Sequence, residues 1–211
     1  MPMPPPPDDL TDLSLADIAR LAEERRLPPV EKWTPTHCGD SQMRIGRDGI
    51  WYHQGSPIGR PAMVRLFSTI LRREPDGRFV LVTPVEKLDI DVEDAPFVAV
   101  ELKSEGEGEG RSLAFRLNTG DLVVAGPDHR LRFRGDSRLS GDSYFSARQE
   151  QAAADLGKSN CPHPYLEVRA GLDALVARPV YYELAEIALA EGASPAGVWS
   201  GGAFFALEPR E

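Results

Sequence analysis

The sequence predicts an α+β fold in two domains, with a duplicated strand/helix/strand motif and a β-rich second domain. The first observation is a repeat, because segment 60–71 returns as segment 178–189 with arginine, proline and two leucines in the same register. The second is a periodic apolar stripe in both copies, which is typical of an amphipathic helix. The third is a series of short apolar segments between glycine turns, a pattern that indicates a β-meander.

The first domain is expected to span residues 11–95, after a proline-rich tail over residues 1–10 that we expect to be disordered. An amphipathic helix is predicted over residues 13–22, because it ends before a Pro-Pro pair that cannot continue it. Two short strands, 43–45 and 50–53, then flank an Asp-Gly pair. This pattern predicts a β-hairpin.

Each copy of the repeat predicts a helix followed by a strand. Proline suits the first turn of a helix, because the missing N–H has no partner there and φ is already close to the helical value. Apolar residues follow at the i, i+3, i+4, i+7 spacing of a face that packs against a core: Met63, Leu66, Phe67 and Ile70, and Tyr181, Leu184, Ala185 and Ala188. The register continues without a gap, so residues 60–82 and 178–200 are expected to superpose.

The second domain, residues 96–211, is expected to consist mostly of strands. Its acidic stretch 105–110 alternates glutamate with glycine and has nothing to bury, which predicts a solvated hairpin tip. A short helix is predicted over residues 149–156. Strand 79–83 closes the first repeat. The strands predicted for the second domain are 97–102, 112–117, 122–125, 131–133 and 165–169.

Composition excludes several classes of function. The chain has 24 basic and 33 acidic residues and a net charge of −9, which repels phosphate backbones and argues against general nucleic-acid binding. No apolar run approaches the roughly 20 residues that span a bilayer, and the first residues lack the basic and apolar regions of a signal peptide. We therefore expect a cytoplasmic protein whose cysteines, Cys38 and Cys161, are reduced thiols.

Several short motifs together resemble an uncharacterised bacterial family, domain of unknown function number twelve eighty-five. These motifs are Pro-Pro-Val-Glu-Lys-Trp at 28–33, Cys-Gly-Asp at 38–40, the segment 48–58, Thr-Pro-Val-Glu-Lys at 83–87 and Asp-Ala-Pro-Phe at 94–97. The resemblance covers nearly the whole chain after the tail. It implies a two-domain α+β protein with an internal duplication and a second domain similar to pleckstrin-homology barrels. It also implies a nucleotide-like ligand at the domain interface and a role in signal transduction.

Two arginines are candidates for binding an anion. Arg60 and Arg178 each precede a helix-opening proline, at a position where a cation is disfavoured by the helix dipole. One reading is an anion site, in which helix N–H groups and a guanidinium converge on phosphate or carboxylate. The other, favoured from the residues alone, is a structural salt bridge to an acid of the other half, such as Asp94 or Glu86.

The first half offers further candidate ligand-binding residues. Trp51 and His53 share one face of the predicted strand, where an aromatic ring stacks on a base or simply fills the core. Thr83, Glu86 and Lys87 close the first repeat, and Lys87 either meets phosphate or pairs with its neighbour Glu86. The second copy has lost these polar groups, so we expect the first half to supply most of the site.

Metal binding and nucleophilic catalysis have weak support. His37-Cys38 and Cys161-Pro162-His163 offer soft ligands, but without the spacing of a zinc knuckle or ribbon, so we predict no structural metal. No Gly-x-Ser-x-Gly elbow and no phosphate-binding glycine loop occur in the sequence. No cofactor is expected beyond a nucleotide-like ligand.

Three hypotheses for the function remain. The first is a non-enzymatic regulatory protein that binds an anionic, nucleotide-like small molecule between its halves. The second is an interaction scaffold that binds a protein partner and takes no small-molecule ligand. The third is a hydrolase, which would require Asp48, His53 and Glu86 to meet in one cleft.

Overall fold

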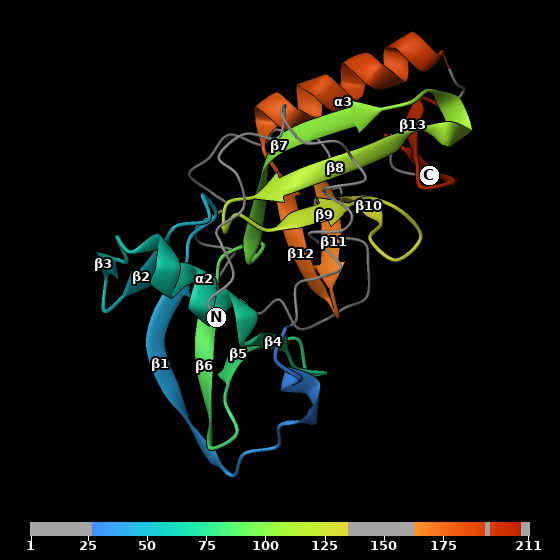
Figure 1. Cartoon of the computed structure of the whole chain (residues 1–211). Helices are drawn as coiled ribbons and strands as arrows, with labels where there is room; N and C mark the ends of the chain where they lie inside the picture. Colours follow the sequence, from blue (N-terminus) through green and yellow to red (C-terminus); the bar gives the residue numbers. More distant parts are fainter. Residues whose placement is uncertain (1–26, 135–162, 193–194, 208–211) are drawn as a thin grey trace.

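The computed structural model describes residues 27–134, 163–192 and 195–207. The predicted tail, the predicted helices over 13–22 and 149–156, and Cys161 lie outside these residues. Within them the fold consists of two six-stranded sheets, a two-stranded hairpin, two α-helices and two short 3-10 turns (Figure 1). This agrees with the predicted α+β class, but both domains, and not only the second, consist mostly of strands.

The N-terminal sheet has the strand order β3-β2-β1-β6-β5-β4. The central strands β1 and β6 are parallel, and every other neighbouring pair is antiparallel. The 3-10 turn η1 (Val30–Lys32) precedes it. The strands are β1 (His37–Ile45), β2 (Trp51–His53), β3 (Ser56–Pro57), β4 (Leu71–Arg73), β5 (Phe79–Val82) and β6 (Glu86–Val92).

The C-terminal sheet has the strand order β10-β11-β12-β7-β8-β9, with β12 and β7 as its parallel pair. Its two halves run in clearly different directions, so that the sheet curls (Figure 1). The strands are β7 (Phe97–Glu105), β8 (Ser112–Leu117), β9 (Leu122–Val124), β10 (Leu131–Arg134), β11 (His163–Arg169) and β12 (Leu172–Val176), and η2 (Gly108–Gly110) lies between β7 and β8.

The two sheets share one topology, and this is the form that the internal duplication takes. In each sheet the first three strands form one meander, the last three form a second, and the first and last strands pair in parallel at the centre. The equivalent strands are therefore β1 to β6 and β7 to β12, in order.

The expected superposition of residues 60–82 on 178–200 is wrong. Helix α2 (Pro61–Thr69) lies between the third and fourth strands of its sheet, whereas α3 (Arg178–Glu191) follows the last strand of its own. In the first copy the helix ends before Leu71, which is fully buried in β4 opposite Leu81. Leu189, its counterpart, is still helical and 77% exposed. The two segments are similar in sequence because both begin a helix with proline, but the two helices occupy different positions in the order of strands.

Local turn chemistry explains the confirmed elements. Asp48 and Gly49 turn the chain between β1 and β2, where the Asp48 carboxylate accepts a hydrogen bond from the Ile50 N–H and Gly49 has a φ of 77°, a conformation that costs glycine little. The meander strands are found close to their predicted bounds, and the acidic stretch 105–110 forms the tip between β7 and β8.

The end of the chain packs on the C-terminal sheet. Helix α3 lies along β7 and is followed by the hairpin of β13 (Gly197–Ser200) and β14 (Ala203–Ala206) (Figure 1). Arg111 at the start of β8 pairs with Glu191 in the last turn of α3 at 2.8 Å, and both side chains are largely buried. This ion pair fixes the end of α3 against the sheet.

One buried hydroxyl joins the hairpin to the sheet. The Ser200 hydroxyl donates to the Ala125 carbonyl at 2.7 Å and accepts from the Leu113 N–H at 2.9 Å, and Ser200 is fully buried. Neither helix in the described part of the chain is long and apolar enough to cross a bilayer.

Replacing the buried hydroxyl tests how strongly it holds the hairpin. Ser200→Ala leaves the Leu113 N–H and the Ala125 carbonyl buried without a partner, and we expect a loss of about 1–3 kcal/mol in the free energy of unfolding. Urea denaturation measures this loss. The control Ser56→Ala, at an exposed edge-strand position, should stay within about 0.5 kcal/mol of wild type. Equal stability of both variants would show that the hydroxyl contributes nothing.

Candidate functional site

Trp51 does not form a ligand platform. Its ring is 1% exposed and stacks on Phe67 of α2, with the ring centroids 6.4 Å apart. The indole N–H has no hydrogen-bond partner among the described residues. The stacking hypothesis for this residue is therefore wrong, because the face of β2 that carries Trp51 is the one that α2 covers. His53 lies exposed at the end of β2.

The two predicted arginines are exposed and lie in different domains. Arg60 is the N-cap residue of α2, and it forms no ion pair with any described residue. Arg178 is the first residue of α3, whose N-cap is Ala177. Arg178 therefore lies one residue after the N-cap position that was predicted for it. The salt bridge proposed for Arg60 is wrong. Asp94 instead accepts from the Tyr165 hydroxyl at 2.8 Å and lies 3.7 Å from Arg47.

The polar residues that follow β5 have structural partners of their own. The Thr83 hydroxyl accepts from the Glu86 N–H at 3.2 Å and closes the turn between β5 and β6. Lys87 pairs with Glu74 at 3.2 Å, not with Glu86 as considered above. Glu74 also pairs with Arg72, at 2.6 Å, and all three side chains are mostly buried. The charge of Lys87 is therefore neutralised by Glu74 within this network.

The residues of the hydrolase hypothesis are not brought together. His53 lies opposite Met43 on β1, Glu86 lies opposite His37 at the far end of the same strand, and Asp48 caps the turn beyond Ile45. At about 3.3 Å per strand residue, His53 and Glu86 are too far apart to share a substrate. Cys38 is exposed, and no group of three or more potential metal ligands occurs among the described residues.

Polar side chains from both domains meet where α2 contacts the C-terminal domain. Arg169, the last residue of β11, donates to the Ser68 carbonyl in the final turn of α2. In the reverse direction, Arg65 of α2 donates to the Thr119 carbonyl in the turn after β8, at 3.0 Å. Helix α2 is thus held by one arginine from each domain.

Asn118 provides a further contact across the same interface. Asn118 donates to the Gly49 carbonyl at 3.0 Å and accepts from the Val98 N–H at 3.0 Å. A Cβ at Gly49 would lie 2.5 Å from the Asn118 side chain, so the tip of the β1–β2 hairpin approaches this turn as closely as glycine allows. The two domains therefore meet through specific polar contacts at α2 and at the β1–β2 turn.

Two arginines at this interface carry charge that no acid balances directly. The Arg169 guanidinium lies 5.6 Å from the centre of the Phe97 ring, and that of Arg73 lies 5.6 Å from the Phe79 ring. A Cβ at Gly171 would lie 3.5 Å from Arg73 Cδ, so the Arg73 stem runs along the turn that follows Arg169. Neither guanidinium forms an ion pair with a described residue. We call Arg73 and Arg169 the interface arginines.

Burial makes Arg169 suited to an anion. Desolvation lowers the pKa of the Arg169 guanidinium, and the charge of Glu31 on η1 acts in the opposite direction. A partly desolvated cation without an ion-pair partner gains more from an incoming anion than an exposed cation does. Sequence reasoning missed both residues, because each ends a short strand and nothing in the local pattern brings β4 to the β11–β12 turn.

Fold and interface together define a class, that of two-sheet proteins with an internal duplication and a polar domain interface. Two family models match the chain: "Domain of unknown function (DUF1285), N-terminal domain" over residues 28–95, and "Protein of unknown function (DUF1285), C-terminal domain" over residues 96–154 and 140–207. The chain belongs to the DUF1285 family, as its motifs predicted.

Two solved structures resemble the chain. A DUF1285 family protein from Silicibacter pomeroyi DSS-3 is 43% identical, with a TM-score of 0.71, over 92% of this chain and 94% of that one. A DUF1285 family protein from Shewanella baltica OS155 is 22% identical, with a TM-score of 0.47, over 70% of this chain and 92% of that one. No curated protein matches the chain.

The network around Glu74 predicts a pH dependence of stability. Burial raises the pKa of the Glu74 carboxyl, but hydrogen bonds from Arg72 and Lys87 outweigh it and hold the pKa below the ordinary value of 4.5. A carboxyl whose pKa is lowered on folding stabilises the fold above 4.5 and loses this contribution as the pH falls through the lower, folded value. Thermal unfolding at several pH values should show Glu74→Gln less stable than wild type at neutral pH, with the difference shrinking in acid.

The matched control for this measurement is Glu86→Gln, because Glu86 forms no ion pair with a described residue. We expect it to follow the wild-type curve at every pH. A constant difference between Glu74→Gln and wild type across the acid range would contradict the assigned coupling.

Proposed function

We propose that the protein is a non-enzymatic regulatory protein that binds a small anionic, nucleotide-like molecule at the interface between its two domains, in a signal-transduction role. The observation that carries the proposal is the pair of interface arginines. Each guanidinium lies 5.6 Å from the centre of a phenylalanine ring, and neither forms an ion pair with a described residue. The Arg73 stem lies beside Gly171, two residues after Arg169, so the two side chains come from adjoining segments of the two domains. Guanidinium groups in such a setting are the usual recognition elements for phosphate.

The overall charge of the chain strengthens this reading. A net charge of −9 repels anions from most of the surface, so two neighbouring cations without an ion-pair partner mark a place where an anion can bind. Arg72, by contrast, is neutralised by Glu74. The likeness of the second domain to pleckstrin-homology barrels belongs to the same proposal. It is supported by the curl of the C-terminal sheet and by the position of α3 after its last strand.

Among the sequence-derived candidates, Arg60 has no direct contact with the ligand in this proposal. It lies at the start of the helix whose other end contacts Arg169, about 12 Å away along the helix axis. His53, Thr83, Glu86, Lys87 and Arg178 retain no part in the proposed contact with the ligand, because they lie elsewhere or are already paired.

A thermal-shift experiment tests the proposal. A ligand that binds only the folded state stabilises it by RT ln(1 + [L]/Kd), about 2.7 kcal/mol at a hundredfold excess over Kd. We expect at least one of ADP, GDP, cyclic AMP and pyrophosphate to raise the melting temperature of the full chain, and adenosine without phosphate to have no effect. Arg73→Ala should abolish this rise.

Arg73 is the informative position because its side chain forms no hydrogen bond with a described residue. Losing the contact with Phe79 costs at most about 1 kcal/mol, or roughly 2–4 °C for a chain of this size, so the unliganded variant should stay folded. Arg178→Ala is the control and should keep the full ligand response. A wild-type protein that responds to none of the anions, or an Arg73→Ala variant that responds normally, would refute the proposal.

A further inference from the structure

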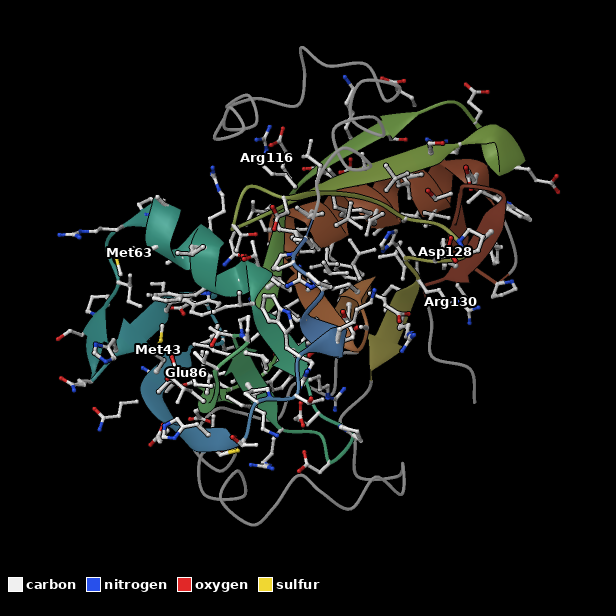
Figure 2. The ribbon with its side chains drawn as sticks, turned by 60° about the horizontal axis from the view of Figure 1, so that its bottom comes forward. Met43, Met63, Glu86, Arg116, Asp128 and Arg130 are labelled. Carbon is white, nitrogen blue, oxygen red and sulfur yellow. The ribbon has the colours of Figure 1, made fainter. Side chains whose placement is uncertain are left out.

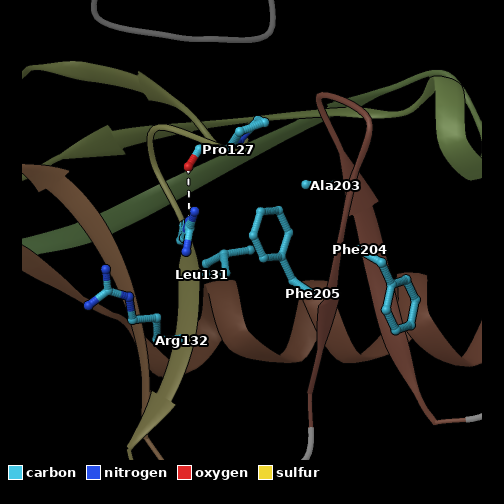
Figure 3. A pocket seen from close by; sticks show the side chains of 7 residues that line it. Pro127, Leu131, Arg132, Ala203, Phe204 and Phe205 are labelled. Carbon is cyan, nitrogen blue, oxygen red and sulfur yellow. Dashed lines mark hydrogen bonds between the residues drawn. The ribbon is translucent and has the colours of Figure 1, made fainter.

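In the part of the chain that the structure describes, strand β10 has one unpaired edge. It is the terminal strand of the C-terminal sheet, and among the described residues no strand pairs with its outer side. Across from this side lies β14 of the C-terminal hairpin, and a pocket of about 420 Å³ separates the two (Figure 3). Arg130, which lines this pocket, and Glu86 lie on opposite sides of the view in Figure 2. All the lining residues belong to the C-terminal domain.

The backbone of β10 is arranged to accept another strand. The Glu167 N–H donates to the Arg130 carbonyl at 2.9 Å, and Arg132 lies opposite Tyr165. Antiparallel neighbours exchange hydrogen bonds at every second residue, so the N–H and C=O groups of Leu131 and Phe133 point away from β11. They form a row of donors and acceptors along the open edge, which is a template for an added strand.

The pocket offers an apolar floor to one side chain of such a strand. Leu131 and Phe205 are 6% and 7% exposed, and they approach each other at the base of the pocket (Figure 3). Ala203 lines the wall and leaves room because its side chain is a single methyl group. A strand added beside β10 would therefore direct an apolar residue into this space.

The opposite face of β10 is basic. Arg130 and Arg132 alternate with Leu131 and thus share the other face of the strand. The Arg130 side chain donates to the Pro127 carbonyl and is otherwise exposed, while Arg132 pairs with Glu167 and remains 48% exposed. Opposite charges on neighbouring strands stabilise pairing and like charges oppose it. A second copy of β10 would place arginine against arginine, so the charges favour an acidic partner strand.

We propose that the open edge of β10 binds an extended segment of a partner protein in which acidic residues alternate with apolar ones. The segment adds a strand to the C-terminal sheet by main-chain hydrogen bonds. Its acidic side chains face Arg130 and Arg132, and an apolar side chain fills the pocket over Leu131 and Phe205.

Fluorescence anisotropy with the full chain and a labelled Glu-Val-Glu-Val-Glu-Val peptide tests this proposal. We expect saturable binding, loss of binding when every glutamate of the peptide is replaced by lysine, and loss when alternate peptide nitrogens are methylated. Arg130→Glu should weaken binding at least about tenfold, because reversing the charge replaces attraction by repulsion. Arg178→Glu, which changes the net charge by the same amount on a different element, should bind as wild type does.

A second variant keeps the result interpretable. Ala203→Leu fills the pocket without changing charge and should also weaken binding at least about tenfold. The proposal is overturned if the wild-type protein does not bind the peptide, if the lysine or methylated peptide binds equally well, or if both Arg130→Glu and Ala203→Leu retain wild-type affinity.

Discussion

The Ser68 carbonyl at the end of α2 is the group on which the relation between the two domains depends. A helix leaves its last carbonyls without internal donors, and Ser68 is fully buried, so water cannot supply the missing bond. Arg169 of the other domain supplies it, at the end of the helix where a cation also complements the dipole. Removing this donor would leave the buried Ser68 carbonyl without a hydrogen-bond partner.

This requirement explains why a cation is retained in a partly desolvated position. Arg169 is held there by the end of α2 and by the Phe97 ring, and the turn that follows it brings the chain alongside Arg73 of β4. The helix that joins the domains thus also assembles the pair of cations in the proposed site. Arg169 thus serves both the contact between the domains and the proposed ligand site. The unpaired edge of β10, in contrast, lies beside the C-terminal hairpin, away from this contact.

The sequence predicted those features that depend on neighbours along the chain. The Asp48-Gly49 turn, the strands of the meander and the proline-opened helices follow from local patterns, and so they were found. Strand β6 was not predicted, although Leu88, Ile90 and Val92 alternate with charged residues, because those residues, Asp89 and Asp91, are of a type that is depleted in strands. Trp51 was wrongly considered as a ligand-binding residue, because the alternation of residues along a strand shows that its two faces differ but not which face a helix covers. Arg169 contacts Ser68 across a hundred residues of chain, a distance no local pattern spans.

Differential scanning calorimetry of Arg169→Met beside the wild-type protein tests the central claim most directly, namely that the contact between Arg169 and α2 couples the two domains. The wild-type protein should unfold in a single transition, because its hydrophobic core runs through both sheets. In the variant, the N-terminal sheet and α2 should unfold at a lower temperature than the C-terminal sheet, which gives a broadened or divided transition. A single transition in the variant at the wild-type temperature would contradict the claim.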